Sequence, residues 1–159
     1  MTTAVRALAL AITLAAVSTP ELAAAQNASL NAISGSIRLR SGFTPDPYRA
    51  SVTAGGGIDA YRDTDLPAAC VGKISDAPDF EVTYSDAGSL PLVFRTISSS
   101  DTTLIINGPD GQWRCDDDSY GDGDAEVRFN NPRNGTYDVW IGSFNGGLAS
   151  TTLLITETP

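Results

Sequence analysis

The residues best suited to chemistry lie in one short run, 115–124, with the sequence CDDDSYGDGD. Five carboxylates fall within nine residues, and glycines flank the later ones. Carboxylates this close repel one another unless water or a hard cation lies between them. Calcium takes about six to eight oxygen ligands from carboxylates, backbone carbonyls and water. The run therefore predicts a calcium site, with these ligands: Asp116, Asp118, Asp122 and Asp124.

A second interpretation of the same run needs no metal. Aspartate side chains commonly accept hydrogen bonds from the backbone of tight turns and otherwise face water. The run is not an EF-hand, because the ligand order differs and no glutamate occupies the twelfth position. Both interpretations remain open at the level of the sequence.

The chain lacks the residues of histidine-dependent catalysis. It contains no histidine, Lys73 is its single lysine, and no Gly-x-Ser-x-Gly motif is present. A carboxylate-dependent hydrolase needs an acid and a base held at a set separation, whereas the acidic candidates here lie in one local run. The composition therefore favours a non-catalytic protein, with a secreted carboxylate-dependent hydrolase as the alternative.

The N-terminal segment is typical of a secretory signal peptide. A single basic residue, Arg6, precedes an apolar run over 7–17, and three alanines at 23–25 precede Gln26. The apolar run is short for a membrane span, although an uncleaved anchor is the alternative. We therefore expect residues 1–25 to be removed and the remainder to be secreted or periplasmic.

The two cysteines, Cys70 and Cys115, both follow that segment. In an exported chain they meet an oxidising compartment, so we expect them to form a disulfide. A soft-metal site is disfavoured, since the chain has no histidine and no further cysteine to complete it.

The charge of the chain limits its partners. The net charge is −9, and loss of residues 1–25 removes one acidic and one basic residue, which leaves that balance unchanged. Such a charge repels nucleic acid and anionic lipid, and it favours cations or basic partners. We expect a monomer that neither binds nucleic acid nor inserts into a membrane, and whose ligand is a protein or a polysaccharide.

Short segments rich in Val, Ile, Thr, Tyr and Phe recur between turn residues, which is typical of an all-β sandwich or barrel. We expect one domain over 26–159, an antiparallel jelly-roll-like β-sandwich. The predicted strands are 36–39, 49–53, 80–84, 92–97, 102–107, 126–129, 137–142 and 151–156.

Some strands carry apolar residues on both faces. Alternation predicts inward-facing sets on five strands: Phe80, Val82 and Tyr84; Val127 and Phe129; Tyr137, Val139 and Ile141; Leu104 and Ile106; and Leu153 and Ile155. A second apolar stripe, on opposite faces, contains Ile105, Trp140 and Leu154. This stripe is either an exposed binding patch or a surface that lies under the N-terminal segment. Four aromatic residues are candidates for a platform that binds sugars or peptides: Trp113, Tyr120, Trp140 and Phe144. Packing of Trp113 against the expected disulfide is the simpler explanation for that residue.

Several motifs occur in a familiar order: DTTL at 101–104, NGPDG at 107–111, DDDS at 116–119 and GTYDVWIG at 135–142. In this order they resemble the bacterial pre-peptidase C-terminal domain, over about 79–157. The resemblance implies a jelly-roll-like β-sandwich appended to secreted peptidases, in some relatives stabilised by calcium or binding substrate, with no catalytic residues. The chain departs from that setting because no peptidase domain precedes the motifs.

Together these patterns predict an exported, non-catalytic binding or accessory module that recognises a protein, a polysaccharide or a surface component. The alternatives are the hydrolase above, a structural envelope protein, and an inhibitor or chaperone of a peptidase.

Overall fold

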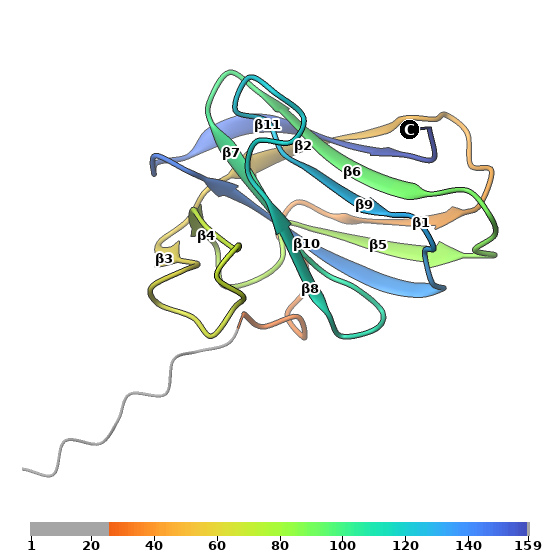
Figure 1. Ribbon diagram of the computed structural model, residues 1–159, viewed down its shortest axis with the longest axis horizontal. Coiled ribbons are helices and arrows are strands. Elements are labelled where there is room, and N and C mark those ends of the chain that lie inside the picture. Colours follow the sequence, from red (N-terminus) through yellow and green to blue (C-terminus); the bar gives the residue numbers. More distant parts are fainter. Residues whose placement is uncertain (1–25, 159) are drawn as a thin grey trace, which may run out of the picture.

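The computed structural model describes residues 26–158, which form two packed β-sheets without a helix (Figure 1). The prediction of an all-β sandwich is therefore confirmed. The predicted signal peptide, residues 1–25, lies outside the described residues. Within 26–158, no helix is long and apolar enough to cross a membrane. The strands are β1 (Ser36–Arg40), β2 (Tyr48–Ala54), β3 (Ile58–Asp59), β4 (Lys73–Ile74), β5 (Phe80–Ser85), β6 (Leu92–Ser98), β7 (Thr102–Asn107), β8 (Trp113–Asp116), β9 (Glu126–Phe129), β10 (Gly135–Ser143) and β11 (Ala149–Thr156).

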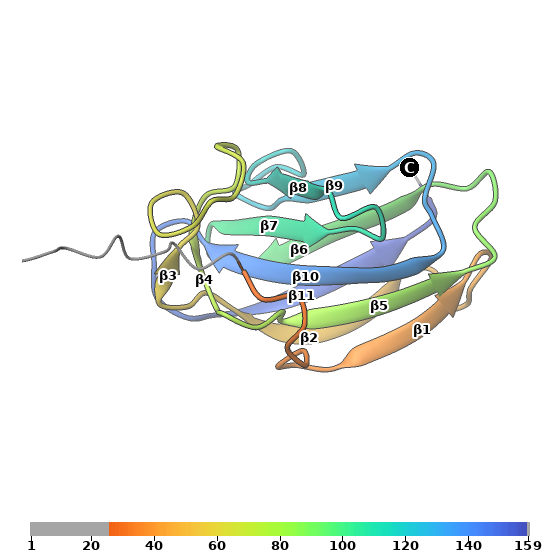
Figure 2. The ribbon, with the colours of Figure 1, turned by 90° about the horizontal axis from the view of Figure 1, so that it is seen from below.

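The two sheets form separate layers (Figure 2). In the first sheet, β10 is central: it pairs with β5 and the end of β4 along one edge and with β7 along the other. Strands β1, β3 and β8 extend this sheet through their pairing with β5, β4 and β7. The second sheet has the order β2-β11-β6-β9.

The main core lies between the two sheets and follows the period of two along each strand. From the first sheet, Val82, Tyr137 and Leu104 are completely buried, as are Phe94 and Leu153 from the second. The ring of Phe94 lies 5.9 Å from that of Phe129 and 5.8 Å from that of Tyr137, measured between centroids. Residues at every second position of a strand share one face, so alternation correctly predicted that Val82, Tyr137, Leu104 and Leu153 face inward.

The prediction of a wholly antiparallel sandwich is wrong at one edge. Strand β1 pairs with β5 in parallel, from Ser36 opposite Glu81 to Arg40 opposite Ser85. Parallel neighbours need a long crossover connection. Here the chain between them passes through β2 of the second sheet and the β3–β4 ribbon before it returns as β5.

Of the two interpretations of the second apolar stripe, the exposed patch is wrong, because its three residues are buried. Ile105 and Trp140 are 0% exposed and Leu154 is 4% exposed. The first two belong to a separate apolar group on the outer face of the first sheet, which we call the outer cluster. The outer cluster consists of Ala60, Cys70, Ile74, Ile105 and Trp140, with Ala28, Ile58, Leu66, Trp113 and Cys115 packed against it.

The cover of the outer cluster comes from two segments. The loop between β3 and β4, residues 60–72, supplies most of it, and Ala28 adds a contact from the N-terminal segment that the sequence proposed as a cover. The predicted disulfide between Cys70 and Cys115 is present and joins this loop to β8. The indole N–H of Trp140 donates to the carbonyl of Asp76, 3.2 Å away. Leu154 lies instead on the outer face of the second sheet, between Arg49 and Arg95 in register.

Candidate binding surface at the hairpin end

A sharp turn joins β10 of the first sheet to β11 of the second; we call it the hairpin, although the two strands do not pair with each other. This turn and the β3–β4 loop lie at the same end of the sandwich, at the left in Figure 1, and both carry exposed apolar side chains. Leu148 and Phe144, in the hairpin turn, are 75% and 49% exposed. Tyr61, in the β3–β4 loop, is 60% exposed. Single exposed apolar residues are ordinary, but a group of large ones on neighbouring loops is typical of a binding surface. We call this region the hairpin end.

The hairpin turn is held in one conformation by its own hydrogen bonds. The amide of Phe144 donates to the carbonyl of Asp101 at 3.1 Å, and the Ser143 hydroxyl donates to the carbonyl of Gly146 at 3.0 Å. Gly146 and Gly147 have φ values of 80° and 86°, a region that glycine occupies without steric cost. The turn therefore presents Phe144 and Leu148 from a fixed backbone.

The hairpin also lies directly against the end of β2. A Cβ atom at Gly55 would lie 2.1 Å from the carbonyl oxygen of Gly147, so only glycine permits this approach. Because the two backbones are in contact, the turn has support from the second sheet as well as from β10.

The β3–β4 loop is fixed beside the hairpin by Asp59. Its carboxylate accepts hydrogen bonds from the amides of Tyr61 and Arg62, and it lies 3.3 Å from the Lys73 ammonium. Burial raises the pKa of Asp59, but the hydrogen bonds from the Arg62 amide and from Lys73 outweigh it and leave the pKa below its ordinary value. Lys73 pairs with Ser143 across β4 and β10, so loop and hairpin share one support.

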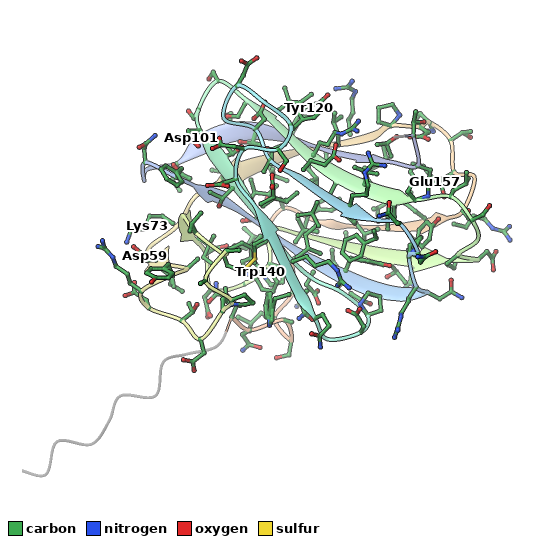
Figure 3. The ribbon with its side chains drawn as sticks, viewed as in Figure 1. Asp59, Lys73, Asp101, Tyr120, Trp140 and Glu157 are labelled. Atoms are coloured by element: carbon green, nitrogen blue, oxygen red, sulfur yellow. A yellow bond between two sulfur atoms is a disulfide. The ribbon has the colours of Figure 1, made fainter. Side chains whose placement is uncertain are left out.

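Asp101 connects the hairpin to the acidic run. Its carboxylate accepts a hydrogen bond from the Asn145 side chain, and a Cβ atom at Gly123 would lie 3.3 Å from its Cα. Figure 3 shows Asp101, Asp59 and Lys73 at the same end of the molecule. Burial raises the pKa of Asp117, and the charges of Asp118, Asp116 and Asp101 raise it further. Carboxylates therefore border the exposed apolar side chains.

Two of the four predicted calcium ligands act as turn caps. The Asp116 carboxylate accepts hydrogen bonds from the amides of Ser119 and Glu126. The Asp124 carboxylate is buried and accepts from the amide of Ser98 and the hydroxyl of Thr102. These contacts are those expected from the second interpretation of the run.

The other two predicted ligands, Asp118 and Asp122, have exposed positions. The described residues contain no group of three or more His, Cys, Asp or Glu side chains arranged to hold a metal ion. Calcium binding by the run therefore stays a prediction.

The predicted aromatic platform is divided in the structure. Trp113 is half-buried in the outer cluster, with its ring centroid 5.2 Å from that of Trp140. Tyr120 is exposed and stacks on the Arg95 guanidinium, 4.8 Å from the ring centroid. Phe144 alone lies at the hairpin end. Sequence reasoning missed Tyr61 and Leu148; the available indication was an Asn-Gly-Gly turn with Phe144 and Leu148 on either side of it.

A second set of carboxyl groups lies on the outer face of the first sheet. Asp138 and Glu81 are opposite each other on β10 and β5. Burial raises the pKa of Asp138 to about 6, and the charge of Glu81 adds to the shift. These are carboxyl groups from different strands, as the hydrolase alternative requires.

No family model matches the chain, and no curated protein sequence matches it. Among solved structures, the chain is similar to Aeromonas hydrophila PliG, a periplasmic lysozyme inhibitor of g-type lysozyme, at 11% identity and a TM-score of 0.43. The match covers 77% of this chain and 96% of that one. A similarity of this degree supports no conclusion about function, and the resemblance to the pre-peptidase C-terminal domain stays a prediction.

Proposed function

We propose that this chain is a non-catalytic binding module that recognises a protein through the hairpin end. The observation that carries the proposal is the exposure of Tyr61, Phe144 and Leu148 on two loops with fixed backbones. Binding energy in protein interfaces concentrates on a few large side chains that enter pockets of the partner. A backbone that is already ordered loses little entropy on binding, which favours affinity.

The charges around these side chains indicate the kind of partner. Asp101 and the acidic run border the apolar group, and the chain as a whole carries a net charge of −9. A negative border accelerates encounter with a positive surface and disfavours acidic partners. The proposed partner is therefore a protein with an apolar pocket in a basic surface; inhibition or protection of a peptidase would be one form of such binding.

The compartment belongs to the same proposal. Both cysteines are joined in the Cys70–Cys115 disulfide, which is common in exported proteins and rare in the cytosol. This supports the expectation that the protein is secreted or periplasmic.

The test uses the disulfide-bonded protein and a double variant, Phe144→Ser with Leu148→Ser. Proteins captured from the exported fraction of the native host are identified, purified and titrated against both forms. Loss of two such anchors weakens binding about thirtyfold or more.

The matched control is Leu30→Ser with Leu90→Ser, which removes two exposed leucines outside the hairpin end. We expect the control to bind within about twofold of the parent, because neither leucine is an anchor there. Equal affinities for the parent and the hairpin variant would refute the proposal.

Calcium binding by the acidic run is a separate part of the proposal. The raised pKa of Asp117 reflects burial and repulsion from Asp118 and Asp116, and a bound cation would relieve that repulsion. Addition of calcium should raise the melting temperature and the chelator EDTA should reverse the rise. Unchanged melting, together with the absence of heat in calorimetric titration, would exclude the site.

The carboxylate-dependent hydrolase is a second candidate, favoured by the raised pKa of Asp138 beside Glu81. An acid with a pKa near 6 beside a carboxylate is the arrangement that glycoside hydrolysis uses. A screen of chromogenic glycosides with the parent and with Asp138→Asn tests it. Absence of turnover that depends on Asp138 would leave the binding function alone.

A further inference from the structure

A separate surface lies on the outer face of the second sheet, away from the main core. A hollow of about 380 Å³ opens there over β2, β11 and β6. Its volume falls in the lower part of the range of small-ligand sites. Its lining includes Ile97 and five hydroxyl-bearing side chains: Ser34, Ser51, Thr53, Ser150 and Thr152.

The register of the strands arranges these side chains as a grid. Thr152 of β11 lies opposite Ser51 on one side and Ile97 on the other, and Ser150 lies opposite Thr53. Neighbouring strands are about 4.8 Å apart, and alternate residues of one strand are about 7 Å apart. Hydroxyl groups therefore repeat in two directions over a shallow surface.

The hydroxyl groups of this grid are available to a ligand. Among the described residues, no hydrogen bond involves the side-chain oxygen of Ser34, Ser51, Thr53, Ser150 or Thr152. Each such group can donate one hydrogen bond and accept others. Ile97, 38% exposed, supplies an apolar surface beside them.

Arginine side chains occupy the next rows of the same face. Arg49 and Arg95 flank Leu154, and Arg128 follows on β9. Glu126 lies 2.6 Å from Arg95 and 3.2 Å from Arg128, so one carboxylate serves two guanidinium groups.

Arg49 is exposed and has no ion pair among the described residues. Arg95 and Arg128 share Glu126, and Tyr120 of the acidic run stacks on Arg95. Among the described residues of this face, Arg49 therefore supplies the unpaired positive charge beside the grid, in a chain whose net charge is −9.

We propose that this face binds a carboxylate-bearing glycan, a strand of an acidic polysaccharide. The free hydroxyl groups of the grid exchange hydrogen bonds with sugar hydroxyls, and Ile97 packs against the C–H face of a ring. Arg49 binds the sugar carboxylate, for which its planar guanidinium is well suited. The charge of Arg49 favours an anionic glycan, while the hydroxyl grid distinguishes a sugar from a simple anion.

Binding is followed at single residues by amide chemical shifts of the labelled protein. The probes are tetragalacturonate, neutral cellotetraose and a thymidine pentanucleotide. We expect tetragalacturonate to shift the amides of Ser51, Thr53, Ile97 and Thr152 and leave the hairpin end unchanged. The proposed ion pair between Arg49 and the sugar carboxylate is partly exposed to water. We therefore expect binding of tetragalacturonate to weaken as the salt concentration is raised.

Two substitutions that preserve β-structure probe the contacts, Arg49→Gln and Thr152→Val. The matched controls, on the outer face of the first sheet, are Arg40→Gln and Thr83→Val. Arg49→Gln should weaken tetragalacturonate binding about tenfold or more, and the controls should change it less than twofold. The proposal is overturned if tetragalacturonate leaves the grid amides unshifted, if cellotetraose or the pentanucleotide binds as tightly, or if the controls weaken binding as much as Arg49→Gln.

This inference does not depend on the protein-binding function. The variant with Phe144→Ser and Leu148→Ser lacks the hairpin anchors but keeps the grid, so it should bind tetragalacturonate like the parent. The failure of one proposal therefore leaves the other intact.

Discussion

The apolar side chains of the main core and of the outer cluster are both buried, but different kinds of structure cover them. The main core lies between two sheets, and each apolar residue in it faces a second layer of strands. The outer cluster has the first sheet on one side and irregular chain on the other, with the Cys70–Cys115 disulfide joining that chain to β8. Burial in the first case follows from strand pairing, whereas in the second it depends on how one loop is held.

The distribution of tryptophan allows the two regions to be observed separately. The chain contains two tryptophans, Trp113 and Trp140, and both lie in the outer cluster. Indole fluorescence therefore reports on the outer cluster, while far-ultraviolet circular dichroism reports on the strands of both sheets. Transitions that do not coincide would show that the regions open independently.

The largest effect should come from the main core. Phe94→Ala removes a fully buried ring that contacts Phe129 and Tyr137, which costs about 3–5 kcal/mol of unfolding free energy. Denaturant unfolding should then shift to lower concentration in fluorescence and circular dichroism together. A shift in fluorescence alone would mean that the main core is not the dominant source of stability.

Removal of the disulfide should instead separate the two probes. Cys70→Ser with Cys115→Ser opens a bridge between residues 45 positions apart, and chain entropy alone gives a loss of about 4 kcal/mol. Because the bridge holds the cover loop, we expect fluorescence to shift to the red before the circular dichroism signal is lost. Coincident transitions would contradict an independently opening outer cluster.

The junction of the two regions should respond to pH through Asp79. Its buried carboxyl accepts hydrogen bonds from the Ile141 amide and the Ser75 hydroxyl. Burial raises the pKa of Asp79 from 3.8 to about 7 and outweighs these hydrogen bonds. A raised pKa means that the folded state binds the proton more tightly than the unfolded state. The stabilisation is therefore complete below about pH 3.8 and is lost as the pH rises through about 7.

Asp79→Asn tests this linkage, because the amide keeps an acceptor oxygen and cannot ionise. The stability of the parent relative to the variant should fall between pH 4 and pH 7, by about 1–3 kcal/mol. Denaturant unfolding of both proteins across this range measures the difference. A difference in unfolding free energy that stays constant with pH would show that Asp79 does not titrate in this range. Asp138 is present in both proteins, so its contribution cancels in the comparison.

The smallest effect should come from Arg114, on β8 at the edge of the sheet that separates the two regions. Its guanidinium pairs with Asp110 at 2.8 Å and stacks on Phe129, 4.7 Å from the ring centroid. Arg114→Ala should lower the free energy of unfolding by about 1 kcal/mol, because it removes a partly exposed ion pair with Asp110 and the stacking on Phe129. Arg40→Ala, which breaks an exposed pair with Asp86, should cost less than about 0.5 kcal/mol. Thermal melts of the two variants measure the difference, and equal losses would argue against the stacking contribution.

Sequence reasoning succeeded where the residues of a single strand are enough to identify it. Strands β7 and β9 were predicted with their observed bounds: alternation defines β9, whereas a run of Thr, Leu and Ile bounded by turn residues defines β7. The strands β3 and β4 were missed because two residues cannot show a period. β8 was missed because it overlaps the acidic run, whose composition resembles a loop. The parallel pairing of β1 depends on the path of the whole chain and has no local pattern.

The candidate sites were harder to predict than the strands, for a related reason. The apolar pattern of Trp140 and Ile105 was recognised, but it does not show whether a loop covers them. The position of Leu148 depends on the contact between Gly55 and Gly147, which are far apart in the sequence. The position of Tyr61 depends on Asp59 and its ion pair with Lys73. The Asp116 and Asp124 carboxylates accept hydrogen bonds from distant amides, which composition alone does not reveal.

The final described turn of the chain determines how the domain can be displayed. The Glu157 carboxylate is buried and accepts hydrogen bonds from the Tyr84 hydroxyl and the Gly42 amide. Figure 3 places Glu157 at the opposite pole from Asp59 and Lys73. A carrier, bead or sensor chip attached beyond Thr158 would therefore hold the molecule by its firmly anchored pole and leave Leu148 facing the solution.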